Sequence, residues 1–540
     1  MTRSEESVDI GWALIFAVMV VTLIFVSAGW ASGTKAPEEA WTKTYSGTID
    51  DQAYSVQQTS DGGFILIGKT QYSADRSNIW LVKTYPDGTG EWSKTFGGPS
   101  FDEARSVQQS SDGGYIFAGY TVSSDNRKQV WLVKTYPDGT GEWNRTFGGI
   151  DDDWAFSVDQ TSDEGYILAG GTYSYGAGWA DVWLVKTESN GDRQWSKFFG
   201  GTDSEEAYSV QQTADGGYIL TGYTESYGAG KRDAWLLKTY SNGTEEWNMT
   251  FGGKEHDWAY SVRQTDDGYI LVGSTSSYGH GQSDVWLLKT YPNGTEEWNM
   301  TFGYTNYDEG YSVRQTADGG YIIAGSTKSY GAGGSDAWLL KTNSNGDELW
   351  NRTFGGSYAD WAYSVQQTTD RGYILAGYTW SFRASSYDFW LIKVKAEGDH
   401  IFDTGYGTYP SLPGTCTGEF IPAYDLKVTK LYTYPCAGTG GHAESIELRE
   451  GNNNLIAKGT WNGYHQSDWH NITLNNETGI ADYVTLLKGH KYNYIIRTGS
   501  YPQIIHLHNV TNDFGTITCS SFTDTNGNTC NDWIPAIRLV

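Results

Sequence analysis

Carboxylates recur at one position of a repeated segment, each just before a short apolar phrase. The seven members are Asp51, Asp102, Asp153, Glu205, Asp257, Asp308 and Asp360. If the repeats surround an axis, these acids would form a ring near one mouth of the channel and could attract a cation. A carboxylate before a strand also accepts backbone N–H bonds in its own loop. Because every copy has the acid, the structural interpretation is favoured.

The position after the acid differs between copies, and function tends to break the symmetry of a repeat. Its occupants are Gln52, Glu103, Trp154, Glu206, Trp258, Glu309 and Trp361. Glutamates and tryptophans alternating around one mouth could take a cation or stack on a sugar. Three candidate binding residues follow from this pattern: Trp154, Trp258 and Trp361.

Glycine-flanked loops form a second candidate surface. Four of them carry a tyrosine, namely Tyr175, Tyr227, Tyr278 and Tyr330. Exposed aromatic residues on such loops bind glycans or partner proteins, and packing over a neighbouring blade is an equal alternative. A second acid set precedes the following strand: Asp181, Asp233, Asp284, Asp336 and Asp388, with Asn78 and Gln129 in the first two copies.

Common catalytic motifs are absent from the sequence. The repeats contain only two histidines, His256 and His280, and no cysteine. No Gly-x-Ser-x-Gly, His-Glu-x-x-His or phosphate-loop pattern occurs. Paired acids for glycoside chemistry remain an alternative because carboxylates are abundant. The sequence therefore favours a binding protein over an enzyme.

Metal-binding signals are weak. His506 and His508 stand two apart on an expected strand, so they would share a face and could hold zinc, although isolated histidines more often form hydrogen bonds. Asp524-Thr-Asn-Gly-Asn resembles part of a calcium loop but lacks EF-hand spacing. No cofactor is firmly implied, and Ca²⁺ is the candidate.

The elements that must position these residues repeat every 51 or 52 residues. One tryptophan recurs at Trp80, Trp131, Trp183, Trp235, Trp286, Trp338 and Trp390, and a second keeps the same interval from Trp41 to Trp350. Each unit has four strand-like phrases joined by turns such as Asp-Gly-Gly and Pro-Asp-Gly. A period of this length predicts a β-propeller.

The phrases also predict the strand order within a blade. The small Ala-Tyr-Ser-Val phrase suits the crowded inner position, and the Trp phrase suits the outer edge. Trp41–Gly47 is then expected to close the ring as the outer strand of the last blade, in preference to the segment that begins at Phe402. We expect an all-β fold: a seven-bladed β-propeller at 41–407, a linker at 408–413 and a C-terminal β-sandwich at 414–540.

Three resemblances accompany this pattern. Gly170-Gly171 with Asp181-Val-Trp183 resembles the Kelch and galactose-oxidase type of repeat, and Thr213-Ala-Asp-Gly-Gly loosely resembles the sialidase Asp-box. Residues 41–396 are more similar to tandem propeller repeats of archaeal cell-surface proteins, especially those of methanogens. Gly459-Thr-Trp-Asn-Gly-Tyr and Asp532-Trp-Ile-Pro extend this similarity to an uncharacterised C-terminal β module. The resemblance implies a surface location and brings no catalytic motif.

The N-terminal segment indicates export. Ile10 to Gly29 runs without a charge, and such a stretch spans a bilayer as one hydrophobic helix or forms a long leader. We assign 1–30 to a signal peptide or an N-terminal transmembrane helix and 31–40 to a linker.

Cysteines and glycosylation sequons also indicate export. All four cysteines lie in the C-terminal module, and the sequence-local pairing would join Cys416 to Cys436 and Cys519 to Cys530. The sequons are at Asn144, Asn242, Asn248, Asn293, Asn299, Asn351, Asn471, Asn476 and Asn509. These features favour an extracellular glycoprotein with disulfides.

Charge limits the partners. The chain has 64 acidic and 37 basic residues and a net charge of −27, which argues against nucleic acid because phosphate contacts need Lys and Arg. We expect a cell-surface binding or adhesion scaffold whose ligand is a glycan or a protein. A polysaccharide-active enzyme and a structural envelope component are the alternatives. Membrane contact is expected through the N-terminal segment only.

Overall fold

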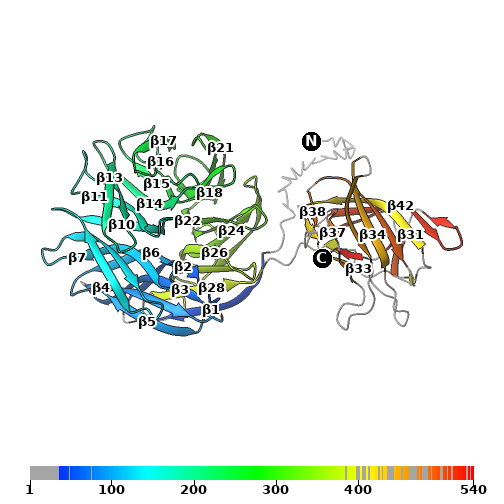
Figure 1. Cartoon of the computed structure of the whole chain (residues 1–540), viewed down its shortest axis with the longest axis horizontal. Helices are drawn as coiled ribbons and strands as arrows, with labels where there is room; N and C mark the ends of the chain where they lie inside the picture. Colours follow the sequence, from blue (N-terminus) through cyan, green and yellow to red (C-terminus); the bar gives the residue numbers. More distant parts are fainter. Residues whose placement is uncertain are drawn as a thin grey trace, which may run out of the picture. The chain divides into compact units, whose positions relative to one another are not determined.

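The computed structural model describes residues 36–396, except positions 48, 75 and 383–385, and a series of strands and short connections between 402 and 539. Every regular element of this part of the chain is a β-strand (Figure 1). The expected N-terminal helix lies outside the described residues, among which no helix meets the length and hydropathy needed to cross a membrane.

Seven four-stranded antiparallel sheets occupy residues 39–394 of the described chain. Their first strands are β2 (Asp51–Gln58), β6 (Asp102–Gln109), β10 (Asp153–Gln160), β14 (Glu205–Gln212), β18 (Asp257–Thr265), β22 (Asp308–Gln315) and β26 (Asp360–Gln367). The second strands are β3 (Phe64–Ser73), β7 (Tyr115–Val122), β11 (Tyr166–Thr172), β15 (Tyr218–Thr224), β19 (Gly268–Thr275), β23 (Tyr321–Thr327) and β27 (Tyr373–Thr379).

The third and fourth strands complete each sheet. The third strands are β4 (Arg76–Thr84), β8 (Lys128–Thr135), β12 (Asp181–Thr187), β16 (Asp233–Thr239), β20 (Asp284–Thr290), β24 (Asp336–Thr342) and β28 (Asp388–Val394). The fourth strands are β5 (Gly90–Phe96), β9 (Gly141–Phe147), β13 (Arg193–Phe199), β17 (Glu245–Phe251), β21 (Glu296–Phe302), β25 (Glu348–Phe354) and β1 (Glu39–Tyr45).

The sheets form a closed ring, which makes this part of the chain a β-propeller. Each first strand packs against the first strands of both neighbouring sheets, and β2 packs against β26, so the first strands surround the axis (Figure 1). The last sheet has the order β1-β28-β27-β26. This confirms the expected order of the phrases and the closure by the N-terminal phrase, because β29 (Phe402–Asp403) pairs with β45 (Ile537–Leu539) instead.

Every first strand contains a β-bulge. In β2 the register shifts between Ala53 and Ser55, and the same shift recurs in the other six first strands. A bulge leaves one residue outside the ladder and re-aims its side chain. The bulged residues are Tyr54, Arg105, Phe156, Tyr208, Tyr260, Tyr311 and Tyr363.

An ion pair between a buried lysine and an exposed aspartate explains two other repeated residues. Lys83, at the end of the third strand, is 2% exposed, and its Nζ lies 2.9 Å from Asp61 of the Asp-Gly-Gly hairpin. The same lysine–aspartate pair recurs in all seven sheets. It links the third strand to the turn between the first two strands, so the repeated lysine and aspartate stabilise each sheet.

The C-terminal part has its own sheets. The largest has the order β37-β35-β34-β39-β31-β42-β41 with β43 beside β42, and the others are β29-β45-β33-β36, β30-β40-β44 and β32-β38. Their bounds are β30 (Tyr409–Pro410), β31 (Gly414–Pro422), β32 (Leu426–Val428), β33 (Lys430–Thr433), β34 (Ala443–Glu450), β35 (Asn454–Thr460), β36 (Asn471–Thr473), β37 (Asn475–Asn476), β38 (Val484–Leu486), β39 (Tyr492–Thr498), β40 (Gln503–His506), β41 (Asn509–Asn512), β42 (Gly515–Asp524), β43 (Thr529–Cys530) and β44 (Trp533–Pro535).

One apolar core joins several of these strands. It includes Phe420, Leu448, Ile496 and Leu539, each at most 3% exposed, from β31, β34, β39 and β45. Among the described cysteines, Sγ of Cys416 in β31 lies 4.0 Å from Sγ of Cys519 in β42. These two strands pair directly, which brings the two thiols together. Cys436 lies outside the described residues.

Candidate functional site

The seven bulged residues form a continuous ring around the axis, here called the girdle. From Phe156 through Tyr208, Tyr260, Tyr311 and Tyr363 to Tyr54, successive ring centroids are 4.5–5.5 Å apart. Arg105 closes the gap, with its guanidinium 4.6 Å from the Tyr54 centroid and 5.2 Å from that of Phe156. The girdle is thus aromatic except at one cation–π position.

Glu103 forms an ion pair with the guanidinium group of Arg105. Its Oε1 accepts a 2.7 Å hydrogen bond from Nε of Arg105, and its other oxygen lies 3.4 Å from Nζ of Lys69. The Glu103 side chain is only 6% exposed. Burial acts to raise the pKa of Glu103, but Arg105 and Lys69 outweigh it, so the pKa lies below the ordinary glutamate value. Glu103 is therefore an ionised acceptor.

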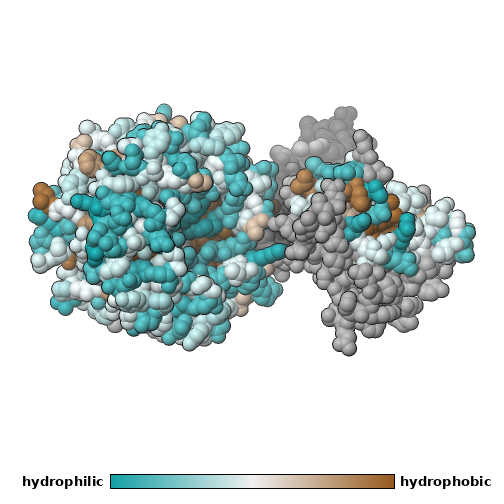
Figure 2. Space-filling model, in the orientation of Figure 1, coloured by the Kyte–Doolittle hydropathy of each residue, from teal (hydrophilic) through white to brown (hydrophobic). Residues whose placement is uncertain are grey.

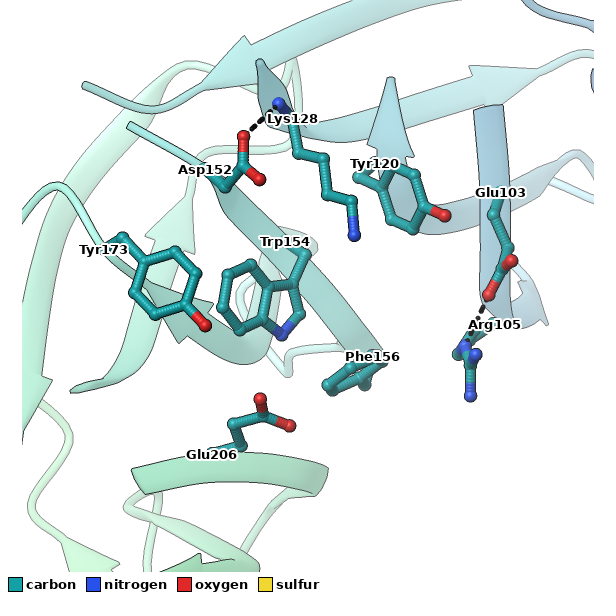
Figure 3. A pocket seen from close by; sticks show the side chains of 9 residues that line it. All are labelled: Glu103, Arg105, Tyr120, Lys128, Asp152, Trp154, Phe156, Tyr173 and Glu206. Carbon is teal, nitrogen blue, oxygen red and sulfur yellow. Dashed lines mark hydrogen bonds and ion pairs between the residues drawn. The ribbon is translucent and has the colours of Figure 1, made fainter. Parts of the chain in front are cut away.

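A recess of about 250 Å³ opens beside Arg105. It is lined by Glu103, Arg105, Tyr120, Lys128, Asp152, Trp154, Phe156, Tyr173 and Glu206. Figure 3 shows Trp154 at its centre, with Tyr173 and Phe156 on either side, Glu206 on one wall and the Glu103–Arg105 pair on another. The rings of Trp154 and Tyr173 are 5.1 Å apart, and Nζ of Lys128 lies 4.6 Å from the Tyr120 centroid.

A second recess of about 380 Å³ adjoins the first. It is lined by the girdle residues and by Glu206, so Arg105, Phe156 and Glu206 belong to both. We call the two together the axial recess. Aromatic walls with a few convergent charged groups are the usual lining of a small-ligand site.

Glu206 and Glu103 differ in their electrostatic surroundings. Burial raises the pKa of Glu206, and the hydrogen bond from Tyr208 and the charges of Arg232 and Arg105 offset only part of this effect. One wall of the axial recess thus holds a carboxyl that keeps its proton to higher pH, and another holds an ionised carboxylate. Such a pair can donate one proton and accept others.

Trp154 supplies an apolar face and an unused donor. It is 7% exposed, and its buried Nε1 has no hydrogen-bond partner among the described residues. In Figure 3 this nitrogen points toward the side of the recess where Glu206 lies. An unpaired buried N–H costs about 1–3 kcal/mol, so a small movement that brings an acceptor oxygen to it would be favourable.

The other two predicted tryptophans lie elsewhere. Trp258 stacks on His256 at 5.3 Å and lines none of the recesses described above. Trp361 lines a separate recess of about 280 Å³ with Tyr307, Glu309 and Lys328. The structure therefore brings only one of the three tryptophans into the axial recess.

The seven acids of the predicted ring are buried and hydrogen-bonded. Its members are at most 1% exposed, and each accepts a hydrogen bond at 2.5–3.0 Å from the backbone N–H four residues earlier. In five copies a threonine hydroxyl of the second strand donates as well. This supports the structural interpretation. Among the described residues no group of three or more His, Cys, Asp or Glu is placed to hold a metal.

The four loop tyrosines are half-exposed, but their hydroxyls and rings contact neighbouring residues. The hydroxyls of Tyr175, Tyr227, Tyr278 and Tyr330 each donate to a glycine carbonyl at 2.8–3.2 Å. Their rings contact the third-strand tryptophan of their own sheet at 5.4–6.0 Å. They hold the loops in place, and each stands in a different sheet.

The remaining candidates are dispersed. Asn144, Asn248, Asn299 and Asn351 are exposed on outer strands, where their Oδ1 atoms accept from tryptophan indoles at 3.2–3.3 Å, and Asn242 and Asn293 are exposed in turns. Asn471, Asn476 and Asn509 belong to β36, β37 and β41. His506 ends β40, and His508 lies outside the described residues.

Sequence reasoning missed Arg105, Phe156 and the rest of the girdle. The signal was present, because the second copy has Arg where the other copies have Tyr or Phe. Lys128, Tyr173 and Asp152 were missed because three separate segments bring them to one recess.

Comparison with known proteins adds little to this geometry. The chain matches no family model, and no curated protein matches it. Among solved structures, the Neurospora crassa Pan2 WD40 domain aligns at TM-score 0.42 and 9% identity over 67% of this chain and 96% of that one. YCF48 bound to D1 peptide gives 0.40 and 10% over 68% and 98%, and an ancestral GH74 enzyme gives 0.39 and 12% over 77% and 54%. The β-propeller assignment rests on the sheet order and ring closure.

Proposed function

We propose that this chain is a binding protein of the cell exterior and that it takes a glycan in the axial recess. The observation that carries the proposal is the break in repeat symmetry at Arg105, where Trp154, Phe156 and Tyr173 stand beside three carboxyl groups. Sugar rings present C–H faces to aromatic side chains and hydroxyls to carboxylates, so this lining suits them. Lys128 and Arg105 add donors for hydroxyl oxygens.

Glycan binding is tested with an array, followed by calorimetry on the best ligand. W154A is expected to weaken binding by at least ~10-fold, because Trp154 provides the central apolar surface of the recess. W258A is the matched control, since Trp258 has the same repeat position but lies outside the axial recess. An array without ligands, or equal losses in the two variants, would reject the proposal.

A second function, polysaccharide hydrolysis, is favoured by the pKa difference between Glu206 and Glu103. In it Glu206 acts as the proton donor and Glu103 as the ionised carboxylate. E206Q would then lower turnover by about 10²–10⁴-fold while ligand binding persists. Turnover would also fall as pH rises through the raised pKa of Glu206. A binder without hydrolysis on a polysaccharide panel excludes this function.

The finer architecture belongs to the same proposal. We infer a seven-bladed propeller of the Kelch-like surface type, on the support of seven four-stranded sheets and the repeat resemblance. The C-terminal part is inferred to be a β-sandwich, on the support of several sheets around one core. A crystal structure of the whole chain tests both.

The location is inferred from sequence features. The charge-free N-terminal stretch, the sequons and the archaeal surface-protein resemblance support export, with anchoring or secretion through residues 1–30. The hydrophilic propeller surface in Figure 2 suits an aqueous exterior. Protease treatment of intact cells, with glycopeptide mass spectrometry, tests the location; protection of the chain would contradict it.

A further inference from the structure

Two rows of hydrogen bonds join neighbouring sheets around the axis. In the first row a serine of one first strand accepts the backbone N–H of a valine in the next sheet, at all seven seams. In the second row, two residues further along, a side-chain oxygen accepts the backbone N–H of a glutamine at 2.5–3.1 Å. Its five acceptors are Gln57, Gln108, Asp159, Gln211 and Gln366.

The second row is broken at two adjacent seams. Its remaining two positions are Arg263 of β18 and Arg314 of β22, and a guanidinium group has donors only. The N–H groups that should meet an acceptor there belong to Gln315 and Gln367. Neither has a side-chain acceptor among the described residues. At these two seams the second row therefore lacks the side-chain acceptor that the other five seams have.

The charge balance at this level is also incomplete. Each arginine donates Nη1 to the carbonyl of the preceding valine, at 2.8 Å for Arg263 and 2.9 Å for Arg314. Asp159 is the one acid of the row, and an oxygen of it already accepts from Gln212 at 3.1 Å. Burial lowers the pKa of both arginines, and the charge of Arg263 lowers the pKa of Arg314 further. The pair thus carries a second positive charge that the row does not neutralise.

We propose that the channel binds a small oxyanion, of the phosphate, sulfate or carboxylate class, between Arg263 and Arg314. Its oxygens would accept from both guanidinium groups and from the N–H groups of Gln315 and Gln367. The anion would supply the acceptors that the other five seams obtain from Gln or Asp. Arg263 stands three residues beyond the girdle residue Tyr260, or about 10 Å at ~3.3 Å per residue, so this site is separate from the axial recess.

The test uses the double variant R263Q/R314Q, which installs the residue that Gln211 and Gln366 provide in two other copies. Inorganic phosphate is titrated by calorimetry and by thermal unfolding, at constant ionic strength with chloride as the reference. Wild type should bind phosphate, and the variant should bind at least ~10-fold more weakly because the charged donors are gone. Without phosphate the variant should have the higher Tm, since the second row is then complete.

Two outcomes of the phosphate titration itself would overturn the proposal. One is an equal rise of Tm in both proteins, because phosphate stabilises folded proteins generally by its exclusion from their surface. The other is no binding of phosphate, sulfate or citrate by wild type. W154A is the control that locates the anion: it should leave phosphate affinity unchanged, and a loss there with no loss in R263Q/R314Q would place the anion in the axial recess and reject the arginine site.

Discussion

Arg105 stands where six other copies of the first strand place an aromatic ring. Its neighbour two residues earlier is Glu103, whereas the first copy has Gln52, whose Oε1 accepts a 2.7 Å bond from the Tyr54 hydroxyl. The two copies are alternative solutions for one backbone position: a charged pair or a neutral hydrogen-bonded pair. The charged solution produces the only guanidinium of the girdle, and the axial recess forms beside it.

R105Y should destabilise the propeller by about 1–2 kcal/mol at pH 7, a discounted figure because Arg105 is 40% exposed and water screens its charge. The lowered pKa of Glu103 in the folded state gives stability above the unfolded pKa, which is lost as pH falls through the folded pKa. The difference between R105Y and wild type in urea unfolding should therefore shrink below about pH 4.

The double variant E103Q/R105Y is the control, because it copies the Gln52–Tyr54 pair of the first sheet. It should recover most of the stability at pH 7 while glycan affinity stays low. A double variant less stable than R105Y would show that the two pairs are not interchangeable at this backbone position.

Cys416 and Cys519 make a second residue-scale prediction. Their sulfurs are 4.0 Å apart on paired strands, so a change of side-chain rotamer can bring them within bonding distance. In protein kept under oxidising conditions, peptide mapping without reductant should recover a Cys416–Cys519 cross-link. Recovery of a Cys416–Cys436 peptide instead would restore the sequence-local pairing.

At the scale of the element, most seams between sheets bring two acids together. The added Cβ of an Ala at Gly355 would lie within 2.5 Å of oxygens of both Asp336 and Asp360, so the two carboxyl groups approach each other across this glycine. Burial raises the pKa of Asp336, and the charge of Asp360 raises it further. In the first sheet Asn78 takes the equivalent place opposite Asp102. The seams thus tolerate an amide where most have an acid.

D336N should stabilise the propeller at pH 7. A folded-state pKa above the unfolded value of about 3.9 means that stability is greatest below that value and declines as pH rises through the folded pKa. The amide removes this decline, so D336N should gain about 0.5–1 kcal/mol at pH 7 relative to wild type and little at pH 3. Urea unfolding at both pH values measures it. An equal loss at both would show that the Gly333 N–H contact to the carboxylate dominates.

The whole ring depends on a strand that is distant in sequence from its partner. β1 pairs with β28, and Nε1 of Trp390 donates a 2.7 Å hydrogen bond to Thr42. Trp41 also contacts Phe64 of the first sheet at 6.0 Å, so β1 touches both sides of the closing seam. The last sheet and the first are therefore stabilised together.

Removal of residues 39–45 should lower the propeller Tm by about 10 °C or more, because an outer strand and its contacts to two sheets are lost. A synthetic peptide of the same seven residues, added in excess, should restore part of the loss by mass action. Calorimetry with and without the peptide measures both effects. An unchanged Tm would mean that another segment closes the ring.

The sequence by itself determined the repeat, the four strands of each sheet, their order and the closing strand, because period, turn residues and hydrophobic alternation are local properties of the chain. It also indicated that the acids of the repeat serve structure, since a residue present in every copy meets a need of every copy. Only the tertiary structure decided which of the residues that vary between copies lie in one recess. Trp154, Arg105 and Glu206 come from three strands, and the bulges and ring closure, not their spacing, bring them to one recess. The same holds for Arg263 and Arg314. The absence of an acceptor at these positions becomes apparent only when the backbone N–H groups of the neighbouring sheet are placed beside them.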